Sequence, residues 1–181
     1  MLIDAERSML LVVDLQERMV PAIPDRDRVV ANAAWLVRLA QRLGVPVAAT
    51  EQYAKGLGTT VDAVRAMLPE GAIAGKTRFS CVAAQCLASL PGNDRPQVVV
   101  VGVETHVCLL QTALELLEEG KEVYVVADCV GSRRDFDRDV ALERLRQEGA
   151  RIVTREMVAF EWLGEAATPL FREVSRDFLK S

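Results

Sequence analysis

The chain has 181 residues, of which 50% are apolar and 27% are charged, and its formal net charge is -4. These values are typical of a globular protein of about one domain, and they exclude a disordered chain, a collagen and a small disulfide-stapled scaffold. Acidic and basic side chains alternate along the sequence, and no basic block exceeds the pair Arg133 and Arg134. Because a nucleic-acid surface needs clustered Lys and Arg, we expect no DNA or RNA partner.

The N-terminal segment favours a cytoplasmic protein with no membrane partner. Its apolar run, Met9 to Val13, ends at Asp14. That run is too short to span a bilayer, and it is unlike a signal peptide. We therefore expect reduced thiols at the four cysteines. His106 is the single histidine, so one chain cannot assemble a zinc site from two or three histidines.

Short apolar runs predict strands that are buried on both faces. They span Met9 to Val13, Val45 to Thr50, Val98 to Val103 and Val123 to Ala127, and a weaker strand spans Arg151 to Thr154. Three stretches with helical spacing lie among these strands and end before Gly44, Gly120 and Gly149. The repeated strand, helix, strand order predicts an α/β fold. We expect one domain over residues 1–181, a three-layer sandwich whose central, mostly parallel sheet has about six strands.

Two segments depart from this alternation. Tyr53 to Thr77 is polar and glycine-rich, which favours a loop that shapes a site. Ala166 to Leu179 carries apolar residues at helical spacing. That stripe either completes the core or meets a neighbouring subunit.

Residues that directly follow predicted strands are candidates for chemistry, because ligands of open α/β sheets bind outside the carboxyl ends of the strands. Asp14, Glu51 and Asp128 hold such positions, as does the segment Glu104 to Cys108. A carboxylate at a strand end must be paired or hydrogen-bonded. For Asp14 a structural cap and a functional acid are about equally favoured. For Asp128 we favour capping of the following turn.

The segment Gly-Val-Glu-Thr-His-Val-Cys, residues 102–108, is the richest local pattern. Cys108 falls in the first turn of the helix after a central strand, where the helix dipole lowers a thiol pKa and N–H groups can hold an oxyanion. The alternative is a small buried core residue, as most unpaired cysteines are. His106 lies two residues earlier and does not face Cys108 on a helix. We interpret it as substrate-facing or structural rather than as the base.

Lys76, in Ala-Gly-Lys-Thr-Arg-Phe-Ser, is either a solvated loop charge or a cation that favours an ionised thiol. Its Gly-Lys-Thr sequence is not a phosphate-binding loop, because the earlier glycine is replaced by Glu70 and no clear buried strand leads into it. The first strand is followed by Asp-Leu-Gln-Glu-Arg, which lacks the glycines of a dinucleotide fingerprint. We therefore expect no nucleotide cofactor.

Three segments together resemble the signature of the isochorismatase-like cysteine hydrolases: Asp14-Leu-Gln16, Lys76-Thr-Arg-Phe-Ser80 and residues 102–108. The match runs in order through essentially the whole chain. Residues 50–58, 76–80 and 125–133 most resemble the isochorismatase domain-containing proteins, a branch whose physiological substrate is generally unassigned. The resemblance implies a Rossmann-like sheet that carries a triad of Asp14, Lys76 and Cys108.

In such enzymes the cysteine attacks a carbonyl carbon, commonly of an amide or carbamoyl group, and water hydrolyses the acyl-enzyme. Asp14 would act as general base and then acid, and Lys76 would stabilise the thiolate and orient Asp14. The resemblance also implies a cis peptide between Val103 and Glu104. It further implies an oxyanion hole built from the N–H groups of Val107 and Cys108.

Other site residues are expected around this triad. Gln16, Gln52, Phe79 and His106 are pocket candidates, with ordinary packing or a solvated loop as the alternative. Metal-binding relatives such as nicotinamidases carry Asp-x-His after the second strand, whereas this chain has Glu51-Gln52-Tyr53. We therefore expect no metal and no other cofactor. Because the family usually oligomerises, we also expect a homo-oligomer, either a dimer or a tetramer.

The leading hypothesis is a metal-independent cysteine hydrolase whose partner is a small amide, carbamoyl or related carbonyl compound. The alternative is a binding or regulatory protein of the same fold in which Cys108 is a redox-sensitive thiol. A third hypothesis is a structural oligomer in which Cys108 is an inert core residue.

Overall fold

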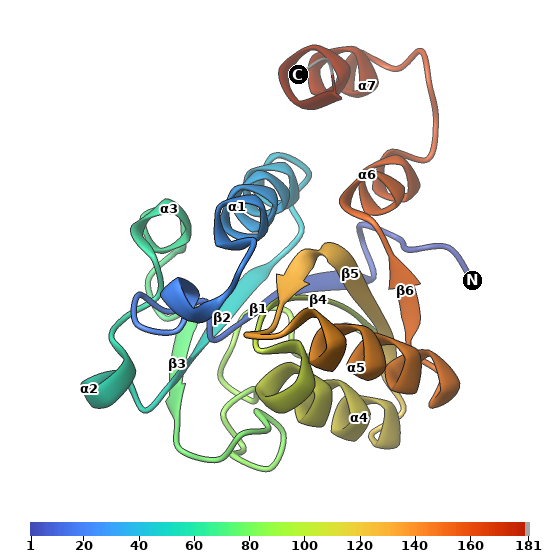
Figure 1. Cartoon of the computed structure of the whole chain (residues 1–181). Coiled ribbons are helices and arrows are strands. Elements are labelled where there is room, and N and C mark those ends of the chain that lie inside the picture. The colour runs from blue at the N-terminus through green and yellow to red at the C-terminus, as the bar shows by residue number, and fades with distance from the viewer. Residues whose placement is uncertain (180–181) are drawn as a thin grey trace.

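The computed structural model describes residues 1–179 and contains a six-stranded sheet between two layers of helices (Figure 1). The strands are ordered β3-β2-β1-β4-β5-β6, and every neighbouring pair is parallel. Their bounds are β1 (Ser8–Val13), β2 (Val47–Gln52), β3 (Ile73–Lys76), β4 (Gln97–Val103), β5 (Glu122–Gly131) and β6 (Arg151–Val153). This architecture confirms the predicted α/β sandwich.

The long helices divide between the two faces of the sheet. Figure 1 shows α1 (Arg26–Arg42) and α6 (Arg155–Leu163) on one face, and α4 (Leu110–Glu118) and α5 (Asp135–Gln147) on the other. The shorter elements are a 3-10 turn, η1 (Val20–Ala22), the helices α2 (Ala54–Leu57), α3 (Asp62–Arg65) and α7 (Pro169–Val174), and two π-helical turns, η2 (Thr105–Leu109) and η3 (Ser175–Leu179).

The continuous apolarity of the central strands follows from this double coverage. In β1, Leu10 and Val12 pack into the core under α1, while Leu11 and Val13 pack into the core under α4. All six residues of β1 are buried.

The order of the strands reverses between β1 and β4, which creates a crevice at the carboxyl edge of the sheet. Val13 pairs with Thr50 on one side and with Gly102 on the other. A side chain at position 102 would collide with β1, because a Cβ there would lie 2.0 Å from the carbonyl oxygen of Val13. Gly102 also has a φ of +119°, which glycine tolerates. The residues after β1, β2 and β4 therefore meet at one edge.

The prediction for residues 53–77 was partly wrong. Instead of a continuous loop, this segment contains α2, α3 and the edge strand β3, so a strand does lead into Lys76. β3 has four residues and Gly75 within it is exposed. A short, partly exposed edge strand has no apolar run, which explains why the sequence pattern did not show it.

The other predicted boundaries need smaller changes. β5 continues to Gly131 past a register shift opposite β4, so Asp128 lies within the strand rather than after it.

The C-terminal stripe forms α7 and η3, and it packs in part against α1. There the Trp35 and Phe178 rings meet edge to face at 5.9 Å, and Trp35 Nε1 donates to the Phe178 carbonyl. Within residues 1–179, no helix is long and apolar enough to cross a membrane.

Candidate active site

Asp14 and Lys76 form a fully buried ion pair at the carboxyl ends of β1 and β3. Lys76 Nζ donates to Asp14 Oδ2 at 2.7 Å, and both side chains are 0% exposed. The other carboxylate oxygen, Oδ1, accepts from Thr50 Oγ1 at 2.7 Å. Asp14 itself has a φ of +48°, which turns the chain sharply after β1. Each carboxylate oxygen therefore has a donor, as a buried charge requires.

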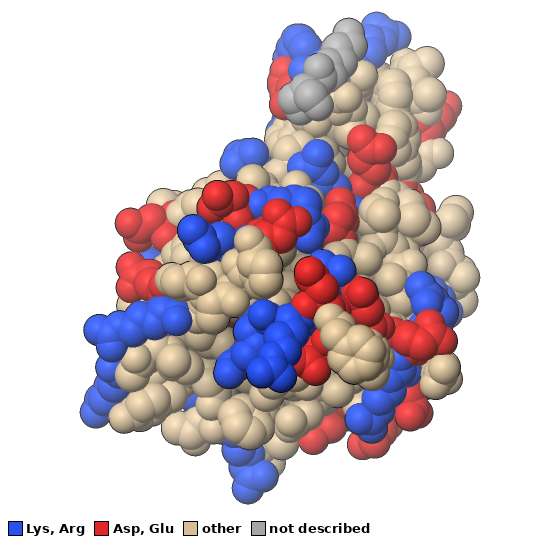
Figure 2. Space-filling view, in the orientation of Figure 1, with Lys and Arg blue, Asp and Glu red and all other residues tan. Residues whose placement is uncertain are grey.

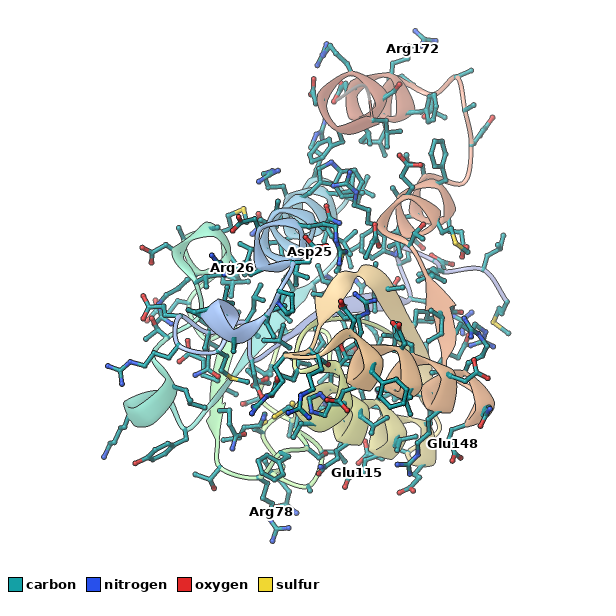
Figure 3. All side chains as sticks on the ribbon, in the orientation of Figure 1. Asp25, Arg26, Arg78, Glu115, Glu148 and Arg172 are labelled. Carbon is teal, nitrogen blue, oxygen red and sulfur yellow. The ribbon has the colours of Figure 1, made fainter. Side chains whose placement is uncertain are left out.

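Lys76 is held by further acceptors and is not a solvated loop charge. Its ammonium also donates to Gln52 Oε1 at 2.7 Å and to the Phe79 carbonyl at 2.9 Å. The Arg78 carbonyl lies at 3.4 Å, while the Arg78 side chain points away from the site into solvent (Figure 3). These partners fix the position of the ammonium, because its three protons have close acceptors on different elements.

Cys108 lies in η2, after β4, next to this ion pair. Its side chain is buried, and burial together with the Asp14 carboxylate raises the pKa of the Cys108 thiol to about 12, against the opposing effect of the Lys76 ammonium. The sequence had predicted a lowered thiol pKa from the helix dipole. In the structure the loss of solvent and the neighbouring carboxylate outweigh that effect. At rest Cys108 is therefore a thiol with a carboxylate beside it.

The Glu104 carbonyl organises the turn that begins η2. The Val103–Glu104 peptide bond is cis. The Glu104 carbonyl accepts from Val107 N at 3.1 Å and from Leu109 N at 3.3 Å, so it bypasses the N–H of Cys108. The Val107 N–H, an implied oxyanion donor, is thus already used within the turn. The Glu104 N–H has no acceptor among residues 1–179.

A second ion pair lies at the rim of the site. Arg133 donates from Nε to Glu104 Oε1 at 2.8 Å and from Nη2 to Oε2 at 2.7 Å. Its backbone N–H also donates to Glu104 Oε1 at 3.0 Å. The guanidinium of Arg133 holds the pKa of the Glu104 carboxyl below its usual value. The side chain of Glu104 is 6% exposed and that of Arg133 is 61% exposed. The carboxylate of this pair is therefore buried, while its guanidinium lies at the surface.

A cavity of about 330 Å³ opens above the Cys108 thiol. Its wall is mainly apolar and is formed by Met19, Ala22, Leu57, Phe79 and Val107. Its polar groups come from Arg18, Gln52, Glu104 and Arg133. A larger hollow of about 810 Å³ lies over the β3 edge, but its lining does not include Cys108. The smaller cavity is therefore the one that reaches the thiol.

The structure separates the four predicted pocket residues into two groups. Gln52 and Phe79 line the cavity, whereas Gln16 and His106 are not part of its lining. The Gln16 amide is fully buried and bonds to the backbone of Gln52 and Gly58. His106 Nδ1 lies 3.0 Å from Ser132 Oγ. Gln16 and His106 therefore match the packing alternative.

Asp128 has a structural role that differs from the predicted one. Its Oδ1 accepts from the Arg155 N–H at the start of α6, at 2.9 Å. Its carbonyl accepts from Arg28 Nη1 and Asn32 Nδ2 on α1. Asp128 thus joins α1 and α6 to β5 and does not cap the turn that follows it.

Thr50 and Arg133 are not among the site residues that the sequence predicts, and Glu51 is indicated only by its place after a strand. Thr50 ends a predicted strand beside the strand that leads to Asp14, and this position was an available signal. Glu51 Oε1 accepts from Thr60 and from Arg65 Nη1, so it fastens the segment after β2. Arg133 had no signal beyond its charge, because its partner lies 29 residues earlier in the chain.

A family model, the isochorismatase domain, matches residues 8–157. The chain belongs to the isochorismatase family. Isochorismatase domain-containing protein 2 from Danio rerio is 41% identical over 172 residues, which cover 93% of this chain and 85% of that protein. Membership of this family supports a hydrolase-type function.

Solved structures agree with this placement. A structure named Mar1 ribonuclease from Caenorhabditis elegans is 36% identical, has a TM-score of 0.89, and covers 100% of this chain and 94% of its own. The YcaC gene product of Escherichia coli, described as an octameric hydrolase of unknown specificity, is 26% identical with a TM-score of 0.86. That similarity covers 91% of this chain and 83% of YcaC. Within residues 1–179, no group of three or more His, Cys, Asp and Glu side chains is placed to hold a metal ion.

Proposed function

We propose that this isochorismatase-family protein is a metal-independent cysteine hydrolase that cleaves small amide, carbamoyl or related carbonyl compounds through an acyl-enzyme on Cys108. One observation carries the proposal. A buried Asp14–Lys76 ion pair lies beside the Cys108 thiol at a cavity of the size of a small molecule. A nucleophile, a proton acceptor and a fixed cation are the groups that acyl transfer needs.

In the first step Cys108 Sγ attacks the carbonyl carbon of the substrate, and its proton passes to Asp14. The raised pKa of Cys108 suits this order, because the thiol holds its proton until the carbonyl is in place. Lys76 stays protonated. Its charge offsets the negative charge as that charge moves from the carboxylate to the substrate oxygen.

The substrate oxygen needs hydrogen-bond donors when it becomes negative. We assign this role to the N–H groups of Cys108 and Glu104, since Val107 N–H already donates to the Glu104 carbonyl. Collapse of the intermediate breaks the C–N bond, and Asp14 gives its proton to the leaving amine. Asp14 then accepts a proton from the water that attacks the thioester, and release of the acid restores the Cys108 thiol.

The cavity lining limits the substrate. Its mainly apolar wall suits a small apolar body, and the Gln52 side chain adds a polar group beside Lys76. Two arginines and one carboxylate, Arg18, Arg133 and Glu104, line the same space. We therefore expect neutral or anionic compounds to be accepted over cationic ones.

Turnover of a panel of small amides and carbamoyl compounds, followed by ammonia release, tests this proposal. We expect activity on part of the panel and its loss in Cys108→Ala. The matched control is Cys129→Ala, since Cys129 is buried in the core on the opposite face of the sheet. Activity that persists in Cys108→Ala would contradict the mechanism. Elemental analysis of the active protein tests whether it works without a metal, which stays a prediction.

RNA cleavage is a second candidate function, because a similar solved structure is named a ribonuclease. The charges of this chain disfavour it, since the net charge is -4. Acidic and basic side chains are also intermingled on the face shown in Figure 2. Incubation with single-stranded RNA separates the two functions. Cleavage that is lost in Cys108→Ala would replace the amide proposal, whereas we expect none.

We also propose that the protein is a homo-oligomer, either a dimer or a tetramer. Large apolar side chains are exposed on α5 and α6: Phe136 is 77% exposed and Phe160 is 51% exposed. The E. coli relative is described as octameric. Light scattering should give a mass that is a multiple of 19.9 kDa, and the mass of one chain would contradict assembly. A cytoplasmic location stays a prediction.

A further inference from the structure

Cys81 and Cys86 stand on one short turn, and the proposed mechanism uses neither of them. The N–H and the Sγ of Cys86 both donate to the Cys81 carbonyl, at 3.2 Å and 3.4 Å. Cys81 is buried and Cys86 is half-buried. The turn thus brings a protected sulfur and an accessible one together.

Helix α4 holds this turn in place. Ser80 Oγ and Ala83 N both donate to Glu115 Oε2, at 2.5 Å and 2.9 Å. Glu115 belongs to α4, where Figure 3 labels it. The Thr112 hydroxyl, on the same helix, accepts from Cys81 N and donates to Cys81 Sγ. The position of Cys81 is therefore fixed by the helix that follows the nucleophile turn.

We propose that Cys81 and Cys86 are a redox-active pair that closes reversibly to a disulfide. The backbone turn already joins the two residues by a hydrogen bond, and Cys86 Sγ lies 3.4 Å from the Cys81 carbonyl oxygen, so the disulfide can form with little movement of the chain. Cys129 is separated from this chemistry, because it belongs to the core on the other face of the sheet.

The two sulfurs have different parts in the reaction. Hydrogen bonding from Cys81, with help from the Lys76 ammonium, lowers the pKa of Cys86 to about 7. The same hydrogen bond and burial raise the pKa of Cys81. Cys86 is therefore the thiol that reacts first with an oxidant, and Cys81 is the one that completes the bond.

With glutathione disulfide as oxidant, the Cys86 thiolate attacks one of its sulfurs and releases one glutathione. Cys81 then loses its proton, attacks the Cys86 sulfur of the mixed disulfide and releases the second glutathione. The two cysteines together lose two electrons, which glutathione disulfide accepts. The reverse exchange with excess glutathione restores both thiols.

The test uses the purified wild-type protein in buffers with a series of glutathione to glutathione disulfide ratios. Samples are quenched with acid, alkylated under denaturing conditions and cleaved after glutamate. Residues 71–104 then form one peptide that contains Cys81 and Cys86 and no other cysteine. We expect this peptide to lose two hydrogens and its alkyl labels in oxidising buffer and to regain both labels with dithiothreitol. Cys129, in another peptide, should stay labelled throughout.

Two variants resolve the order of the steps. Cys81→Ser should stop the reaction at a glutathione adduct on Cys86, and Cys86→Ser should leave Cys81 labelled and free of glutathione. Wild-type protein that keeps both alkyl labels in oxidising buffer would overturn the proposal. So would a wild-type glutathione adduct on Cys86 that never resolves. Neither result depends on whether the protein is a hydrolase.

Discussion

Two ion pairs flank Cys108, and they differ in their exposure to solvent. In the Asp14–Lys76 pair both side chains are 0% exposed, whereas in the Glu104–Arg133 pair the arginine is 61% exposed. The N···O distance is 2.7 Å in each. The two pairs therefore have the same contact distance and differ in how deeply they are buried.

Burial decides what each pair contributes. Water does not screen the inner pair, so its charges act strongly on the neighbouring thiol. The outer pair loses most of its attraction to solvent. Its contribution is mainly geometric, because Arg133 holds the side chain of the residue from which η2 begins. We therefore assign the transfer of the Cys108 proton to the inner pair and the positioning of η2 to the rim pair.

The largest effect is expected from Asp14→Asn, which removes the proton acceptor. Hydrolytic turnover should fall by about 10²-fold to 10⁴-fold. Alkylation of Cys108 by iodoacetamide at neutral pH should become faster, because the carboxylate that raises the thiol pKa is gone while Lys76 remains. Peptide mass spectrometry and turnover assays measure the two rates. Asp25→Asn, at the exposed start of α1 (Figure 3), is the control. Rates that fall together would contradict this assignment.

Lys76→Met tests the cost of breaking the inner pair. We expect a loss of about 3–5 kcal/mol in the free energy of unfolding, because Asp14 is left as a buried charge without a cation. The double variant Asp14→Leu with Lys76→Met should recover much of that stability and remain inactive. Urea unfolding measures both, with Lys55→Met, at an exposed lysine, as control. A single variant as stable as the wild type would show that the pair is not buried in solution.

Arg133→Gln tests the rim pair and should have a smaller effect. We expect a change in stability below about 1 kcal/mol and a several-fold loss in kcat/KM, since Glu104 is less firmly held. Salt should weaken the wild-type rim pair and leave the inner pair unchanged. The neighbouring Arg134→Gln is the control. A loss as large as that in Asp14→Asn would mean that the rim pair takes part in the chemistry.

The smallest expected effect is a change in how the stability of the protein depends on pH. Arg133 lowers the pKa of Glu104 in the folded chain. The pair therefore stabilises the protein above the ordinary carboxyl pKa, and that stability is lost as the pH falls through the lowered value. The stability difference between wild type and Arg133→Gln should thus shrink in acid. Unfolding at a series of pH values measures it, and a difference that grows in acid would reverse the assigned sign.

The contrast between these two pairs also shows what the sequence could predict. β1 and β4 have continuous apolar runs, so the positions of Asp14 after β1 and of Cys108 in the turn that follows β4 could be predicted from the pattern. Lys76 ends a short edge strand with no such run. Only the resemblance to a family placed it in the site.

The remaining features depend on tertiary contacts. Arg133 meets Glu104 across 29 positions, and no local pattern encodes that meeting. The pKa shift of the Cys108 thiol was predicted in the wrong direction, because it too depends on tertiary contacts. Helix position is visible in the sequence, whereas the burial and the carboxylate that raise the Cys108 pKa come from packing.

The formation of an acyl group on Cys108 tests the proposed mechanism most directly. The protein is mixed with p-nitrophenyl acetate, a reactive ester, and the acetylated position is mapped by peptide mass spectrometry while p-nitrophenolate release is followed. We expect a burst of one equivalent per chain with the acetyl group on Cys108, and no burst in Cys108→Ala. Acetyl groups on lysines or hydroxyls, with Cys108 left as a free thiol, would contradict it.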